Sequence, residues 1–95
     1  MRGNETTIKQ ALKLFLKKYN LEEQVNEGRV YNVWNQTMGN FVVNRTTKLK
    51  FYKGKLIVYL NSSALRNELL MARTPIIQKL NEELGEELIT ELEIH

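Results

Sequence analysis

Apolar residues near the start of the chain recur at helical spacing. Large apolar side chains stand at intervals of four, three and four residues, at Ile8, Leu12, Phe15 and Tyr19. These intervals place them on one face of a helix, and lysines occupy another side. The pattern predicts an amphipathic helix over residues 7–19, capped by Thr6 or Thr7. A second helix is expected from Asn20, as its N-cap, to about residue 38, with Gly28 as a candidate break and Gly39 as the stop.

Residues 48–61 change to a period of two and give the clearest local signal. Two β-rich runs flank Lys53-Gly54, a dipeptide that suits a two-residue hairpin turn. The cross-strand pairs that this turn directs to the buried face are Phe51 with Leu56 and Leu49 with Val58. Because alternate residues of a strand project to opposite faces, the other face mixes cations with aromatic rings. It carries Lys48, Lys50, Tyr52, Lys55, Ile57 and Tyr59.

The last third of the chain predicts a long helix and a final strand. Asn61, Ser62 and Ser63 are candidate caps, and Gly85 is the expected end of the helix. Pro75 lies inside the apolar stripe and should kink the helix or split it in two. Residues 89–94 alternate apolar and polar, which indicates a third strand beside the hairpin. The segment 41–47 is compatible with a helical turn or with the approach to a strand.

The expected fold is therefore a small α+β domain with the order α-α-β-β-α-β. A three-stranded sheet, mixed or antiparallel, would carry its helices on one face. The length of 95 residues allows one modest core, so we expect a single domain over residues 1–95 with residues 1–6 flexible. The apolar content of 42% and the charged content of 26% are those of an ordinary globular protein.

The absence of cysteine excludes disulfides and thiolate metal sites, and it favours a reducing cytoplasm. The N-terminus lacks the apolar core of a secretion signal. No apolar run approaches the ~20 residues that span a bilayer. We therefore expect a cytoplasmic protein with no membrane partner.

Charge is unevenly distributed along the chain. Residues 1–55 carry 11 Lys and Arg against 4 Glu, whereas residues 56–95 carry 3 against 7. This asymmetry suggests a basic face for an anionic partner, with nucleic acid as the first candidate. The alternative is that these charges only solvate the surface.

Residues that carry chemistry are sparse. His95 is the sole histidine and ends the chain, aspartate is missing, and the adjacent glutamate pairs splay apart on a helix. There is no Gly-rich phosphate loop and no GXXG loop of the kind that KH domains use to clamp nucleic acid. We expect no enzyme activity, no cofactor, no metal and no small-molecule substrate.

The outer face of the hairpin is the candidate binding site. Its lysines can contact phosphates, and its tyrosines offer rings on which bases can stack, a combination typical of sequence-tolerant single-strand binding. The candidate residues are Lys48, Lys50, Tyr52, Lys53, Lys55 and Tyr59. The alternative reading is that they serve solubility and cross-strand pairing. Trp34, which falls in the apolar stripe, is expected in the core.

Several segments in a fixed order resemble the DciA family. They are Val33-Trp34 before Met38-Gly39, the hairpin from Leu49 to Val58, Asn61-Ser62-Ser63-Ala64-Leu65 at a helix start, and Leu80-Asn81 before Leu84-Gly85. The resemblance covers roughly residues 25–94. This sequence departs from the family pattern in two places. Leu65 stands where the family often has tryptophan, and the sequence stops at His95 without the long flexible C-terminal tail that many relatives carry.

The resemblance implies a KH-like fold, DNA binding and contact with the replicative helicase to assist its loading in bacteria, with no catalysis and no cofactor. Without a tail, any helicase contact would lie within the folded domain. Two alternatives stay open: an adaptor whose basic face docks on an acidic protein surface, and an RNA-binding KH-like module.

Overall fold

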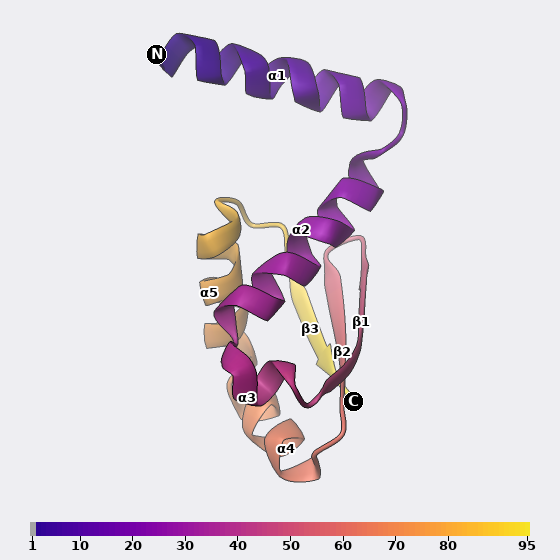
Figure 1. Cartoon of the computed structure of the whole chain (residues 1–95), viewed down its shortest axis with the longest axis vertical. Coiled ribbons are helices and arrows are strands. Elements are labelled where there is room, and N and C mark those ends of the chain that lie inside the picture. Colours follow the sequence, from indigo (N-terminus) through magenta and orange to yellow (C-terminus); the bar gives the residue numbers. More distant parts are fainter. Residues whose placement is uncertain (1) are drawn as a thin grey trace.

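A three-stranded sheet with helices on one side forms the body of the molecule (Figure 1). The computed structural model describes the backbone of residues 2–95 and the side chains from residue 7 onward. The elements are α1 (Arg2–Lys18), α2 (Glu22–Thr37), α3 (Gly39–Val43), β1 (Thr46–Tyr52), β2 (Lys55–Leu60), α4 (Ser63–Met71), α5 (Arg73–Leu84) and β3 (Glu91–Ile94). The α+β class and the predicted order are confirmed, with one short extra helix and one divided helix. Flexibility of residues 1–6 stays a prediction, because Met1 and the side chains of residues 2–6 lie outside the described residues.

The two N-terminal helices are present, but their predicted starts are wrong, whereas both end within one residue of the predicted positions. The backbone of α1 is helical from Arg2, five residues before the expected start, because no proline interrupts this stretch. Asn20 does not cap α2. It adopts a left-handed conformation, with φ of 57°, in the turn between the helices, and Leu21 takes the cap position without a side-chain hydrogen bond. α2 then continues through Gly28 to Thr37.

The hairpin has the predicted turn and register. Lys53 and Gly54 have φ of 46° and 86°, the two positive values that a type I′ turn requires. Phe51 lies opposite Leu56, and Leu49 opposite Val58. β3 joins the other edge of β2 in parallel, so the sheet is mixed, with the order β1-β2-β3.

Proline divides the predicted long helix in two. α4 ends at Met71 and α5 begins at Arg73, so that Pro75 lies in the first turn of α5, where its missing N–H needs no helical partner. The Ser62 side chain caps α4 by accepting a hydrogen bond from the Leu65 N–H at 3.2 Å. Gly85 ends α5 in a left-handed conformation, with φ of 80°.

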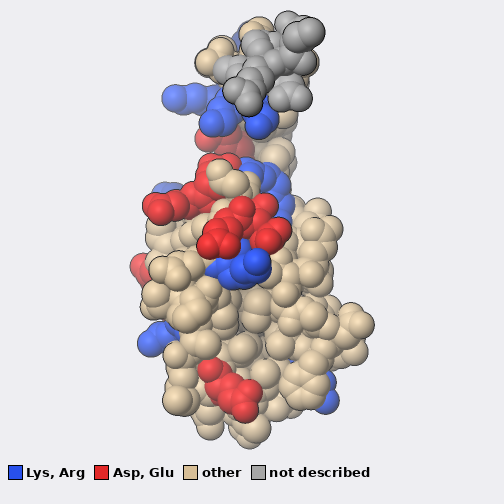
Figure 2. Space-filling view, turned by 90° about the vertical axis from the view of Figure 1, so that its left-hand side faces the viewer, with Lys and Arg blue, Asp and Glu red and all other residues tan. Residues whose placement is uncertain are grey.

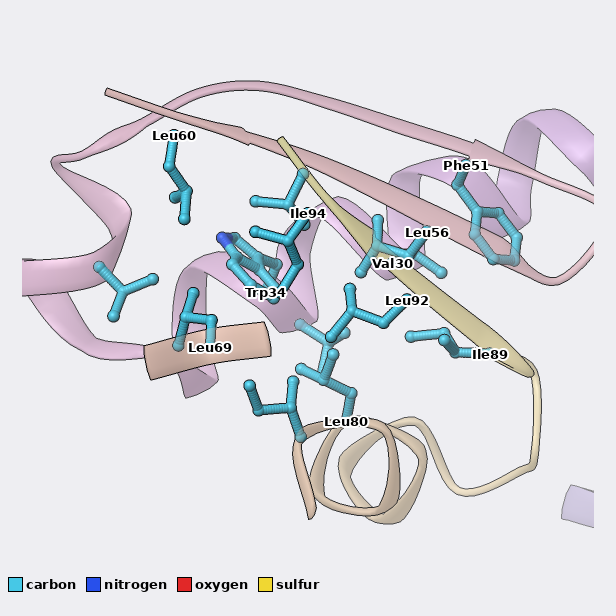
Figure 3. Packing of buried hydrophobic residues seen from close by; sticks show 14 of the residues in the cluster. Val30, Trp34, Phe51, Leu56, Leu60, Leu69, Leu80, Ile89, Leu92 and Ile94 are labelled. Carbon is cyan, nitrogen blue, oxygen red and sulfur yellow. The ribbon is translucent and has the colours of Figure 1, made fainter. Parts of the chain in front are cut away.

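The core lies between the inner face of the sheet and helices α2, α4 and α5, and Figure 3 shows its central side chains. Trp34 is fully buried, as predicted, and its indole Nε1–H donates to Thr46 Oγ1 at 3.2 Å. Thr46 Oγ1 in turn donates to the Val42 carbonyl at 2.9 Å. This chain of bonds satisfies the one polar atom of the indole and joins α2 to the start of β1.

Two polar side chains fix the loop that leads from α5 into β3. The Asn81 side chain bonds both backbone groups of Ile89: its Nδ2 donates to the carbonyl at 2.8 Å, and its Oδ1 accepts from the N–H at 2.9 Å. Arg29 on α2 donates to the Leu84 carbonyl at 3.0 Å and to Glu86 at 2.7 Å. The direction in which β3 enters the sheet therefore depends on contacts made by α2 and α5.

Candidate nucleic-acid interface

The face of the sheet that points away from the helices brings most of the candidate residues together. In the observed register Lys48 pairs with Tyr59, Lys50 with Ile57, and Tyr52 with Lys55, as the alternation predicted. Same-face residues of a strand are about 6.8 Å apart. The exposed side chains of β1 therefore form a row of two lysines and one tyrosine along an edge of the sheet.

Tyr59 lies at the centre of a cation-rich group. The Nζ atoms of Lys50 and Lys48 lie 5.8 and 6.0 Å from its ring centroid. Its ring also stacks on His95, with centroids 5.1 Å apart and planes inclined by 24°. A cation within about 6 Å of the centroid of an aromatic ring is attracted electrostatically to the face of the ring. A base that stacked near Tyr59 would therefore have lysines within reach of its phosphates.

A second, smaller group lies at the hairpin turn. Tyr52 is exposed, and the Lys53 Nζ lies 5.3 Å from its ring centroid. Lys53 itself belongs to the turn and not to the strand face, because its backbone has left-handed φ. Five of the six candidate residues thus form two aromatic-cation groups on one hairpin.

Lys55 differs from the other lysines because it faces β3. Its Nζ lies 3.4 Å from Glu93 Oε1 and 4.0 Å from Glu91 Oε2. Glu93 also contacts His95 Nε2 at 3.0 Å. Hydrogen bonds from His95, and then from Lys55, lower the pKa of the Glu93 carboxyl below its ordinary value. The β3 half of the face is therefore mixed in charge, whereas the β1 half is basic.

The sequence interpretation missed Glu91, Glu93 and His95 as parts of this face. Their alternation with Leu92 and Ile94 contained the signal, because it placed all three on the side opposite to the buried residues. The alternation did not indicate which strand lies beside β3. In the structure this strand is β2, and the pairing places Glu93 level with Ile57.

The opposite side of the molecule has a different electrostatic character. Figure 2 shows the side on which α5 lies, where acidic side chains gather toward the end that leads to α1. A hollow of about 820 Å³ there, between α5 and the loop before β3, is lined in part by Glu82, Glu86 and Glu87. Its negative lining is unsuited to a phosphate, so the basic sheet face remains the candidate for nucleic acid.

The described part of the chain holds no candidate metal cluster and no candidate membrane span. Among its side chains, no group of three or more histidine and acidic residues has the arrangement of a metal site. Across residues 2–95 no helix combines the length and the apolar character needed to cross a membrane.

Comparison with known families agrees with the segments singled out above. The family model described as "Dna[CI] antecedent, DciA" matches residues 7–94. The chain belongs to the DciA family. Membership indicates a role in DNA replication and helicase loading. Members of this family are accessories of helicase loading, and the family is not known as an enzyme family. A search of curated proteins finds no match.

The family segments hold mainly structural positions in this chain. Trp34 fills the core, Gly54 forms the turn, and Asn81 fixes the loop before β3. Leu65 at the start of α4 is also buried. These residues support the fold of this chain, whereas its functional surface has to be inferred from the exposed side chains.

Proposed function

We propose that this chain is a non-enzymatic accessory of DNA replication that binds DNA, preferably single-stranded, through the outer face of its hairpin. In this proposal it acts in the cytoplasm and assists loading of the replicative helicase without a cofactor or small-molecule substrate. The observation that carries the proposal is the clustering of Lys48 and Lys50 around Tyr59 on an exposed sheet face. Membership of the DciA family supports the replication role.

The proposed binding mode divides the work between charge and stacking. Lys48, Lys50 and Lys53 neutralise phosphates, which supplies affinity that does not depend on sequence. Tyr59 and Tyr52 offer ring surfaces at the two ends of the hairpin, and stacking on an aromatic side chain contributes about 1–3 kcal/mol per base. Lys55 contributes less in the free protein, because Glu93 and Glu91 already neutralise it.

The direct test is a fluorescence-anisotropy titration with labelled single-stranded DNA at several salt concentrations. A Lys48→Gln/Lys50→Gln variant should reduce the slope of log affinity against log salt by about 1.4, since each single-strand phosphate contact contributes about 0.7. The matched control is Arg73→Gln/Lys79→Gln, which removes the same charge from α5 on the helix side. Equal losses in both variants, or salt-insensitive binding, would refute the site.

Two further measurements address the choice of nucleic acid. Competition with RNA of equal length distinguishes a DNA accessory from an RNA-binding module, and competition with duplex DNA tests the preference for single strands. Because RNA strands carry the same phosphate charge, the salt slope alone does not separate them. Tighter binding of RNA would favour the RNA-binding alternative.

A second candidate function is a protein-interaction adaptor, favoured by the mixed charge of the β3 half of the face. Lys55, Glu93 and Glu91 interleave there, an arrangement that gives directional complementarity to a protein surface. In this case Lys50→Glu/Lys55→Glu should abolish binding of purified replicative helicase in solution free of DNA. If helicase binding survives the reversal, the docking surface lies elsewhere on the domain.

A further inference from the structure

Helix α1 carries an apolar stripe that the rest of the domain leaves uncovered. The stripe consists of Ile8, Leu12, Phe15 and, directly after the helix, Tyr19, whose exposed fractions are 66%, 55%, 53% and 55%. Phe15 and Tyr19 contact each other, with ring centroids 4.8 Å apart. Figure 1 shows α1 projecting from the body, which it joins through α2.

The core of the domain is complete without this helix. None of the described side chains of α1 belongs to the buried cluster, which is built from α2, the sheet and the later helices. A lone helix of 17 residues is marginal in water, and most helical stability comes from packing of an apolar face. A contiguous exposed apolar surface of this kind marks an interaction site.

The polar side of α1 indicates how a partner can approach. Lys9, Lys13 and Lys17 are rotated about 100–180° from Ile8, given 100° per residue. They therefore lie on the side of the helix opposite to the stripe and remain in water when the stripe is covered. A polyanion would contact these lysines and leave the stripe exposed, so the stripe calls for an apolar partner.

Within the described chain, the matching apolar surface is the same stripe on a second copy. Other exposed large apolar residues, such as Phe41, Tyr52 and Met71, stand singly on separate elements. We propose that α1 is a self-association helix that pairs in antiparallel fashion with α1 of a second copy. The pairing is isologous, with Ile8 level with Tyr19 of the second copy and Leu12 level with its Phe15.

The direction of the pair follows from charge and from the position of the body. A parallel pair would place the two Lys18 side chains at the same end of the pair, which like-charge repulsion opposes. It would also bring the two bodies side by side, since each is joined to the C-terminal end of its α1. In the antiparallel pair these lysines lie at opposite ends, and so do the two bodies. The dimer would then carry two sheet faces.

The test is sedimentation of the full chain over a range of concentrations. A helix pair of this length lies near the lower size limit for a specific interface, so we expect a dimer that forms in the micromolar range, roughly 1–100 µM. Leu12→Glu/Phe15→Glu should shift this midpoint at least tenfold upward. Leu14→Glu is the matched control, because Leu14 is 69% exposed on α1 but lies off the stripe. Fluorescence of the buried Trp34 verifies that each variant keeps its core.

Cross-linking tests the direction of the pair, since the chain has no cysteine of its own. Ile8→Cys protein mixed with Tyr19→Cys protein should form a mixed disulfide. Ile8→Cys alone should not, because the two sites would lie about 17 Å apart along the helices. Cross-linking of Ile8→Cys to itself would overturn the antiparallel geometry. A protein that stays monomeric at high concentration would overturn self-association, and cosedimentation of that monomer with phosphatidylglycerol vesicles would assign the stripe to a lipid surface.

Discussion

Replacing Glu93 with glutamine is expected to tighten binding of single-stranded DNA and to steepen its salt dependence. In the free protein the Glu93 carboxylate contacts Lys55 Nζ at 3.4 Å and His95 Nε2 at 3.0 Å. It therefore occupies the place of an anion on the face where we propose that phosphates bind. Removing its charge leaves Lys55 available for a phosphate, and glutamine keeps the size of the side chain.

The magnitude follows from one additional phosphate contact. The slope of log affinity against log salt should become steeper by about 0.7 for a single strand. Lowering the salt fourfold, from 200 to 50 mM, should then give a gain in affinity roughly threefold larger in the variant than in the parent protein. Glu91→Gln should have a smaller effect, because its carboxylate is 4.0 Å from Lys55 and more exposed.

The assay is the same anisotropy titration, performed as a double-mutant cycle with Lys55→Gln. If Glu93 acts through Lys55, the gain should disappear in Glu93→Gln/Lys55→Gln, because coupled residues are not additive. Glu87→Gln serves as a control for net charge, since Glu87 lines the hollow beside α5 and is not part of the sheet face. An unchanged slope in Glu93→Gln, or an equal gain in Glu87→Gln, would refute the reasoning.

Three further predictions concern stability. Gly54→Ala should lower the free energy of unfolding by more than the ~1–2 kcal/mol that a left-handed alanine costs, because the alanine Cβ would lie 2.6 Å from Thr90 Oγ1. Urea unfolding measures this loss, and an unchanged midpoint would contradict the prediction. Asn81→Ala should cost about 1–3 kcal/mol, because both backbone groups of Ile89 lose a partner, which a thermal melt would register as a lower midpoint. Burial, and then the charge of Glu27, raises the pKa of Tyr31, so this phenol stabilises the fold below pH 10.0 and the contribution is lost as pH rises through its folded pKa. Tyr31→Phe should therefore lose less stability above pH 10.0 than the parent protein, and identical alkaline profiles would contradict the assignment.

The sequence by itself determined the local structure wherever a residue type permits few conformations. Lys53-Gly54 fixed the turn and, through the turn, the register of the hairpin and the side to which each strand residue points. Pro75 required a break in the long apolar helix, and Ser62 and Gly85 marked helix ends by their capping chemistry. The six candidate residues were proposed from this alternation and stay a prediction, whereas the predicted burial of Trp34 is confirmed.

Tertiary structure decided what depends on contacts between distant segments. The alternation of residues 89–94 predicted a strand, but its parallel pairing with β2 depends on how α4 and α5 carry the chain back along the sheet before β3 begins. That pairing brings Glu93 to Lys55 and His95 to Tyr59, and it divides the candidate face into a basic half and a mixed half. The helical periodicity of residues 8–19 likewise predicted an apolar face, but it did not indicate whether another element covers that face. Periodicity reports which residues share a face, whereas the presence of a covering surface depends on the whole fold.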